Sequence, residues 1–149
     1  MAEGPTYEVR VLGPDDGAVL QRVALGVFDN DIDPAATAQF LTEPRNHMVI
    51  AVEEGEVIGF ASAMDYIHPD KPLPMLFVNE VGVGDAHRRR GIGRELVKVM
   101  LRRAADLGIQ EAWVATESNN LPARRLYEAT GGVEADDAVV MYTYRLVTG

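Results

Sequence analysis

The run HRRRGIGRE of residues 87–95 contains four arginines and two glycines. A stripe of apolar residues that continues to Leu107 predicts a helix from Gly91 onward. The first N–H groups of a helix have no intrahelical partner, and glycines let a ligand approach them closely, so such a helix start binds anions. The residues of this predicted anion site are Arg88, Arg89, Arg90, Gly91, Ile92, Gly93 and Arg94.

Two known phosphate-binding glycine loops do not match this run. A Walker loop requires Gly-Lys-Ser/Thr, which is absent, and a dinucleotide fingerprint requires a third glycine where Leu96 stands. If the fingerprint is counted from Gly82 and Gly84 instead, His87 stands where its third glycine is required. The remaining pattern is Arg-x-x-Gly-x-Gly from Arg88, which by itself also fits an exposed basic helix start.

A second motif, ESNNLPARRLYEATGG, occupies residues 117–132, after the next predicted strand. Together the two motifs resemble the GNAT family of N-acetyltransferases, whose pyrophosphate-binding loop looks like the first. The second resembles the family's Asn-x-x-Ala-x-x-Leu-Tyr-x-x-x-Gly-Gly segment. Its matching residues are Asn120, Ala123, Leu126, Tyr127, Gly131 and Gly132. The resemblance covers residues 48–146 and implies acetyl-coenzyme A as the acetyl donor.

A narrower resemblance is to aminoglycoside 3-N-acetyltransferases. It rests on three short segments: 79–83, 87–89 and, in the last predicted strand, 140–142. The family resemblance also makes a homodimer plausible.

The resemblance implies a donor site along one strand and the helix that follows it. Backbone groups of Val81 and Val83 would pair with the pantetheine arm as a further strand does. Backbone N–H groups of residues 89–94 would hold the pyrophosphate, and Asn120 would contact the arm where two parallel strands splay apart. The expected donor-binding residues are Val81, Gly82, Val83, Arg88, Arg89, Arg90, Gly91, Ile92, Gly93, Arg94, Asn120 and Ala123.

Acetyl transfer to an amine requires a base, because alkyl ammonium groups have a pKa near ~10. Glu80 stands beside the implied thioester and is the candidate, acting directly or through water; it could instead only orient the acceptor. The aminoglycoside group has Asp at this position, so the longer side chain changes the geometry. Tyr127 resembles the family's general acid, and the N–H of Val81 could stabilise the oxyanion.

Charge predicts the nature of the acceptor. Residues 1–65 hold 12 acidic and 3 basic side chains and so carry all of the net charge of −9, whereas seven of the 14 basic residues lie between Arg88 and Arg103. An acidic wall suits an aminoglycoside, a polyamine or a lysine-rich peptide or N-terminus, although helix capping and solubility would also explain it. The candidate acceptor-binding residues are Phe28, Asp29, Asp31, Asp33, Asp65, Tyr66, Asp136 and Asp137.

Composition excludes several other classes. The acidic balance argues against nucleic acid as the main partner, and the absence of cysteine excludes disulfides and thiolate sites. The three histidines lack metal-ligand spacing, so no metal is expected. No apolar run reaches membrane-spanning length and no secretory signal is visible, so a cytoplasmic location is expected. A catalytically silent acyl-coenzyme A-binding module is the alternative of another class.

Local patterns predict one domain over residues 1–149, with an α/β fold of the GNAT type. We expect a mixed, mostly antiparallel sheet flanked by helices on both faces, with a splayed parallel strand pair. The predicted strands are 6–12, 48–52, 57–64, 75–83, 112–115 and 139–147. The predicted helices run from Asp15 or Asp16 to about Phe28, from Pro34 to before Pro44, from Gly91 to Leu107 and from Pro122 to Thr130.

Overall fold

A computed structural model describes residues 6–147. Its five strands form one sheet in the order β1-β2-β3-β4-β5, antiparallel except for the parallel pair of β4 and β5. In chain order the elements are β1 (Glu8–Val11), the 3-10 helix η1 (Gly17–Gln21), α1 (Pro34–Thr42), β2 (Asn46–Glu53), β3 (Glu56–Tyr66), β4 (Met75–Val83), the 3-10 turn η2 (Asp85–His87), α2 (Ile92–Asp106), β5 (Ala112–Val114) and α3 (Leu121–Ala129). The expected mixed α/β sheet is confirmed.

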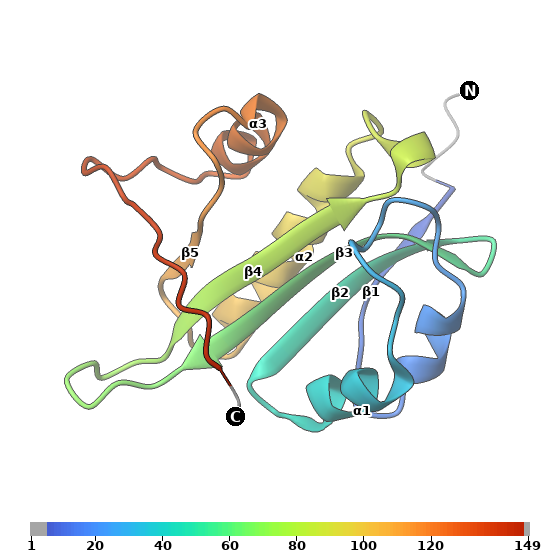
Figure 1. Ribbon diagram of the computed structural model, residues 1–149, viewed down its shortest axis with the longest axis horizontal. Coiled ribbons are helices and arrows are strands. Elements are labelled where there is room, and N and C mark those ends of the chain that lie inside the picture. The colour runs from blue at the N-terminus through green and yellow to red at the C-terminus, as the bar shows by residue number, and fades with distance from the viewer. Residues whose placement is uncertain (1–5, 148–149) are drawn as a thin grey trace.

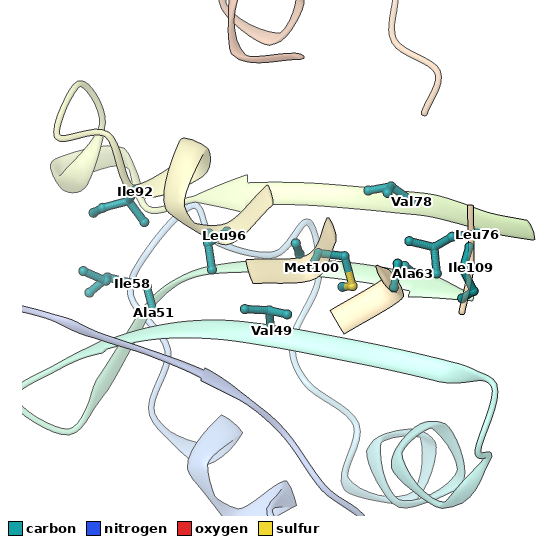
Figure 2. Close-up of a cluster of buried hydrophobic side chains, with 12 residues drawn as sticks. Val49, Ala51, Ile58, Ala63, Leu76, Val78, Ile92, Leu96, Met100 and Ile109 are labelled. Carbon is teal, nitrogen blue, oxygen red and sulfur yellow. The ribbon is translucent and has the colours of Figure 1, made fainter. Parts of the chain in front are cut away.

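Helices cover both faces of this sheet, because alternate residues of each strand point to opposite sides. On β2, Val49 and Ala51 face α2 and form a buried cluster with Leu96 and Met100 (Figure 2). The alternate residues of β2 pack in a second cluster with η1 and α1, whose members are Leu12, Leu20, Val27, Leu41, Met48, Ile50, Val57 and Phe60. Figure 1 shows α2 behind the sheet and α1 on its other side. No helix within residues 6–147 is long and apolar enough to cross a membrane.

Most predicted elements form where local signals place them. The Asp33 side chain caps α1 by accepting hydrogen bonds from the backbone N–H groups of Ala35 (2.8 Å) and Ala36 (3.1 Å). Glu54 and Gly55 both have positive φ, 52° and 76°, in the tight turn between β2 and β3.

The helix predicted from Asp15 or Asp16 to Phe28 is wrong. Only η1 forms, and residues 22–33 run on as an irregular loop. This loop is held by the sheet: the N–H of Ala24 donates to the carbonyl of Val57 (2.9 Å), and the N–H of Val57 donates to the carbonyl of Arg22 (2.9 Å). Non-local backbone pairing therefore overrides the apolar stripe that favoured a helix.

The last predicted strand is also wrong. Residues 139–147 form no strand, and their apolar side chains are exposed; Met141 is 82% and Leu146 88% accessible. A segment with an alternating apolar pattern forms a strand only where it can pair with the edge of another strand. Here β5 pairs over three residues with β4 and with no other described strand.

Candidate active site

The sheet opens at the middle of β4. Parallel pairing with β5 runs from Leu76 to Val78 and then stops, while β4 continues to Val83. The pairing with β3 shifts by one residue at this point, which leaves Asn79 as a bulge. In Figure 1 the chain after β5 diverges from β4 toward α3.

Beyond the bulge, alternate backbone groups of β4 point away from β3. Gly84, just after β4, donates its N–H to the carbonyl of Ile58 on β3 (2.8 Å). Along an antiparallel strand, successive residues direct their backbone N–H and C=O groups alternately toward one neighbouring strand and toward the other side. By this alternation Val81 and Val83 direct their N–H and C=O groups toward the side that β5 has left. These are the two residues predicted to pair with a pantetheine arm.

The predicted anion site lies at the N-terminus of α2. Gly91 is the N-cap residue, with φ of 78°, and no side chain within residues 6–147 caps the helix. A Cβ at Gly91 would meet nothing within 4 Å, so there is open space beside the N-cap residue itself. The first backbone N–H groups of α2, from Ile92 onward, have no intrahelical partner and are donors that an anion could accept.

Two of the predicted arginines have side-chain partners elsewhere. Arg90 forms an ion pair with Glu53 (2.6 Å) and lies over the Tyr7 ring, 5.6 Å from its centroid. Arg88 pairs with Asp85 (3.1 Å). The Arg90 guanidinium thus ties the loop to the C-terminal end of β2, while its backbone N–H stays available to a ligand.

Helix α3 packs against the start of α2. A Cβ added to Gly93 would lie 3.3 Å from the Leu126 side chain, so the two helices meet closely there. Asn120 caps α3, with its Oδ1 accepting the N–H of Ala123 (3.2 Å), which leaves the amide NH₂ to reach a ligand. Tyr127 is half-buried, and this burial raises the pKa of its phenol, so the hydroxyl keeps its proton at neutral pH.

On the other side of β4, the loop of residues 22–33 runs antiparallel to the strand. The N–H of Asp85 donates to the carbonyl of Leu25 (3.0 Å). Further back along the strand, a Cβ on Gly82 would lie only 2.3 Å from the carbonyl oxygen of Val27. Glycine at position 82 is therefore what lets the loop lie against the strand.

The same loop brings an aromatic ring and a carboxylate onto β4. Phe28 stacks on Phe60, with ring centroids 4.0 Å apart, and Phe60 is the β3 partner of Gly82. The next loop residue, Asp29, reaches Glu80, two positions before Gly82. Partial burial, the negative charge of Asp29 and a hydrogen bond with it together raise the pKa of Glu80.

Glu80 faces a cavity of about 350 Å³ between this loop, α1 and β2. The charged side chains that line it are Asp29, Asp31, Asp33 and Glu80, and no basic residue of the described chain does so. The wall is otherwise largely apolar, with Phe28, Ile32, Phe40, Leu41 and Met48 among its residues. A second cavity of about 900 Å³ adjoins it and shares residues 28–32 of its wall. A cation with an apolar body suits such a surface.

The remaining predicted acceptor residues lie outside these walls. Asp65 accepts a hydrogen bond from the buried His47 (2.7 Å), at the opposite end of β3 from the loop. Tyr66 ends β3, and Asp136 and Asp137 belong to the exposed segment after α3. Among residues 6–147 no three His, Asp or Glu side chains gather as metal ligands would.

Thr37 and Phe40 of α1 also line the cavity, although neither is among the predicted acceptor residues. Phe40 follows an ordinary helical apolar pattern, which carries no signal of a ligand site. Gly82 stands among the predicted donor residues, but its N–H points toward β3, and its close approach to Val27 lets the loop lie on the strand.

Curated relatives share part of this chain. The L-2,4-diaminobutyric acid acetyltransferase of Virgibacillus pantothenticus is 35% identical over 79 residues, which are 53% of this chain and 48% of that protein. Aminoglycoside N(6')-acetyltransferase type 1 of Salmonella typhimurium is 28% identical over 99 residues, 64% of this chain and 68% of that protein. The chain thus spans about half of the first relative's length. This aminoglycoside relative is an N(6') enzyme. The comparisons therefore do not support the narrower resemblance to aminoglycoside 3-N-acetyltransferases.

Solved structures share the fold at lower identity. Aminoglycoside N-acetyltransferase AAC(6')-Iy in complex with CoA superposes with a TM-score of 0.75 at 21% identity, covering 98% of this chain and 99% of that one. An aminoglycoside acetyltransferase from an uncultured soil metagenomic sample, in complex with sisomicin, gives 0.78 at 18% identity, covering 95% and 97%. The acetyltransferase (GNAT) family model matches residues 19–132, more than half of the sequence. With the open edge of β4 and the uncapped start of α2, this match shows that the chain belongs to the GNAT family.

Proposed function

We propose that residues 1–149 form one acetyl-coenzyme A-dependent N-acetyltransferase domain that acetylates a primary amine of a small cationic acceptor. The observation that carries the proposal is the arrangement around β4. Its outer backbone edge at Val81 and Val83 pairs with no strand of the described chain and leads to the N-terminus of α2, while Glu80 on the same strand faces an acidic cavity. One strand thus serves both substrates.

In this proposal the donor lies along the edge of β4. Val81 and Val83 pair with the pantetheine arm, and the N–H groups at the start of α2 hold the pyrophosphate. Their orientation toward the open side supports this role. Asn120, whose Oδ1 is already used in capping, contributes its NH₂ group as a donor.

Glu80 accepts the proton that the acceptor ammonium must lose, directly or through water. Its raised pKa makes it a better match to this task than an ordinary carboxylate. The amine nitrogen then forms a bond to the thioester carbonyl carbon, and the N–H of Val81 stabilises the oxyanion. Tyr127 gives its proton to the departing sulfur as the carbon–sulfur bond breaks and the carbonyl re-forms. The second proton on the attacking nitrogen is lost to solvent, and Tyr127 regains a proton from solvent.

The acidic cavity favours acceptors with several amino groups. The names of two relatives, a diaminobutyric acid and an aminoglycoside acetyltransferase, point to such acceptors in those proteins. For this chain we propose an aminoglycoside or polyamine ahead of a protein lysine or N-terminus, because four carboxylates line one cavity and suit an acceptor with several ammonium groups.

The decisive experiment measures coenzyme A thiol release with butylamine, 1,4-diaminobutane, spermidine, an aminoglycoside and a lysine peptide. We expect kcat/KM to rise with the number of amino groups and to fall with added salt, because exposed charges are screened over about 10 Å at 0.1 M salt. Asp31→Asn should reduce the salt effect, whereas Asp106→Asn, an equal charge change at the exposed end of α2, should not. Coenzyme A binding without thiol release for any amine would instead favour a silent acyl-coenzyme A-binding module.

The homodimer is a further proposal, supported by the apolar side chains that residues 139–147 expose. Monomeric proteins rarely expose contiguous apolar surface of this kind. Sedimentation equilibrium should show a dimer that Met141→Asp and Tyr142→Asp together weaken. A monomer at all accessible concentrations would contradict it.

A further inference from the structure

The loop of residues 88–91, just before α2, has a strained backbone. Arg89 has φ of 64° and Gly91 has φ of 78°, so the residues on both sides of Arg90 lie in the left-handed region. A residue other than glycine adopts this conformation only at a cost in free energy, and it persists where surrounding contacts hold it. Within residues 6–147 no hydrogen bond between backbone groups involves residues 88–90. The shape of the loop must therefore be held by a side chain.

The Arg90 side chain holds the loop by reaching two distant segments. Its Nη2 and Nη1 donate to the two carboxylate oxygens of Glu53, over 2.6 Å and 3.2 Å. Nη2 also donates to the hydroxyl of Thr6 (3.0 Å), and the guanidinium lies over the Tyr7 ring. Nη1 donates to Nδ1 of His87 (2.9 Å), in the turn just before the loop. A bidentate bond to a carboxylate fixes the orientation of a guanidinium as well as its distance.

The Glu53–Arg90 pair differs from an ordinary surface ion pair. Exposed pairs contribute little, because water screens the charges and two long side chains lose their freedom. Here the side chains of Glu53 and Arg90 are only 21% and 34% exposed, and the Thr6 hydroxyl donates to the same carboxylate. Glu53 also ends β2, which pairs with a strand on each side and so provides a rigid anchor.

We propose that Glu53 is a positioning residue for the acetyl donor: through Arg90 it holds the backbone N–H groups before and at the start of α2 in the arrangement that binds a pyrophosphate. The inference rests on the proposed function for the identity of this ligand. Because the Arg90 guanidinium is bound to Glu53, Arg90 acts on the donor through the backbone that it holds. Thr6 and Tyr7, far away in the sequence, belong to the same support.

Charge and positioning predict opposite effects when the Glu53 carboxylate is removed. Coenzyme A is an anion, so the loss of a nearby negative charge would by itself tighten its binding. Loss of the support weakens binding, because the apparent Kd rises as the fraction of molecules whose loop keeps the binding shape falls. If that fraction falls to about one tenth, Kd rises roughly tenfold.

The first test is calorimetric titration of wild type and Glu53→Gln with coenzyme A, for which we expect roughly tenfold weaker binding by the variant. Pantetheine, which lacks the pyrophosphate, should bind both proteins equally, and with acetyl-coenzyme A the KM should rise while kcat is unchanged. Glu54→Gln, an equal charge change at the exposed neighbouring residue, is the matched control and should not weaken binding. Equal or tighter binding of coenzyme A by Glu53→Gln would overturn the inference. An equal loss of pantetheine binding would also overturn it, because it would indicate general damage to the fold.

The second test requires no ligand. In ¹⁵N relaxation of the free protein, the order parameters of the Arg89, Arg90 and Gly91 amides should fall in Glu53→Gln and remain unchanged in Glu54→Gln. Arg90→Lys keeps the charge but loses the bidentate geometry, so it should lower the same order parameters and repeats the test if Glu53→Gln does not fold. Unchanged order parameters in the folded variants would overturn the positioning role. The proposed function fails separately, if the wild-type protein does not bind coenzyme A.

Discussion

Gly82 offers a sharp test of how the acceptor site is assembled. In Gly82→Ala the new Cβ would lie 2.3 Å from the Val27 carbonyl oxygen and 2.6 Å from a ring carbon of Phe60. Separations below 3.0 Å essentially never occur for real Cβ atoms, so the Val27 backbone must retreat. The loop should therefore lift from β4 and carry Asp29 away from Glu80.

The expected cost follows from overpacking, which destabilises well-packed sites by about 1–3 kcal/mol. For a chain of this size each kcal/mol lowers Tm by about 2–4 °C, so Tm should fall by roughly 2–12 °C. Kinetics should show a higher KM for the amine. The affinity for coenzyme A should change little, because the Gly82 N–H points toward β3 rather than toward the donor.

Thermal unfolding, acetyl-transfer kinetics and coenzyme A calorimetry measure these three quantities. Gly84→Ala is the matched control two residues along, where a Cβ meets its nearest atom, in the His87 side chain, at 3.2 Å. That contact yields by small side-chain adjustment, so its effects should be smaller. Unchanged Tm and amine KM in Gly82→Ala would refute the idea that this close contact seats the loop.

Three other substitutions probe separate parts of the molecule. Gly91→Val puts a branched residue at a position with φ of 78° at the predicted pyrophosphate site, and calorimetry should show strongly weakened coenzyme A binding in a folded protein. Tyr127→Phe should lower kcat with little change in donor affinity, and full activity would remove the hydroxyl from the mechanism. Hydrogen bonds from Arg90 and Thr6 lower the pKa of Glu53 to about 2, from an ordinary value of 4.5. The ionised carboxylate therefore stabilises the folded state above pH 4.5, and this contribution is lost as the pH falls toward 2. Urea unfolding across this range should therefore show a shallower decline for Glu53→Gln, and equal slopes would argue against the effect.

Elements marked by local signals could be predicted from the sequence. Asp33-Pro34 at the start of α1, Glu54-Gly55 in the β2–β3 turn and the arginine–glycine run before α2 each determine the backbone within a few residues. A Cβ on Gly93, at the start of α2, would accordingly lie 3.8 Å from the Val83 side chain at the end of β4, so these two predicted donor segments are neighbours.

The acceptor side depended on contacts between distant residues, which periodicity does not encode. Residues 22–33 contain an apolar stripe typical of a helix, yet their backbone pairs with Val57 and packs on Gly82. Asp65 was a plausible acceptor carboxylate by charge alone, but it lies at the far end of β3 and binds His47. Charge composition thus predicted an acidic site but could not select its members.

The bulge at Asn79 links these two halves of the site. An antiparallel strand directs its backbone within the sheet and its side chains to the two faces. Past the bulge β4 no longer pairs with β5, so the backbone groups of Val81 and Val83 that point away from β3 are available to a ligand. The side chain of Glu80 points to the face of the sheet that α1 covers. On the proposed mechanism the donor therefore approaches along the sheet edge and the amine from the sheet face, and their paths meet at Glu80 and Val81. The acidic loop can then change to suit another amine without disturbing the donor edge, since the two use different sides of the same strand.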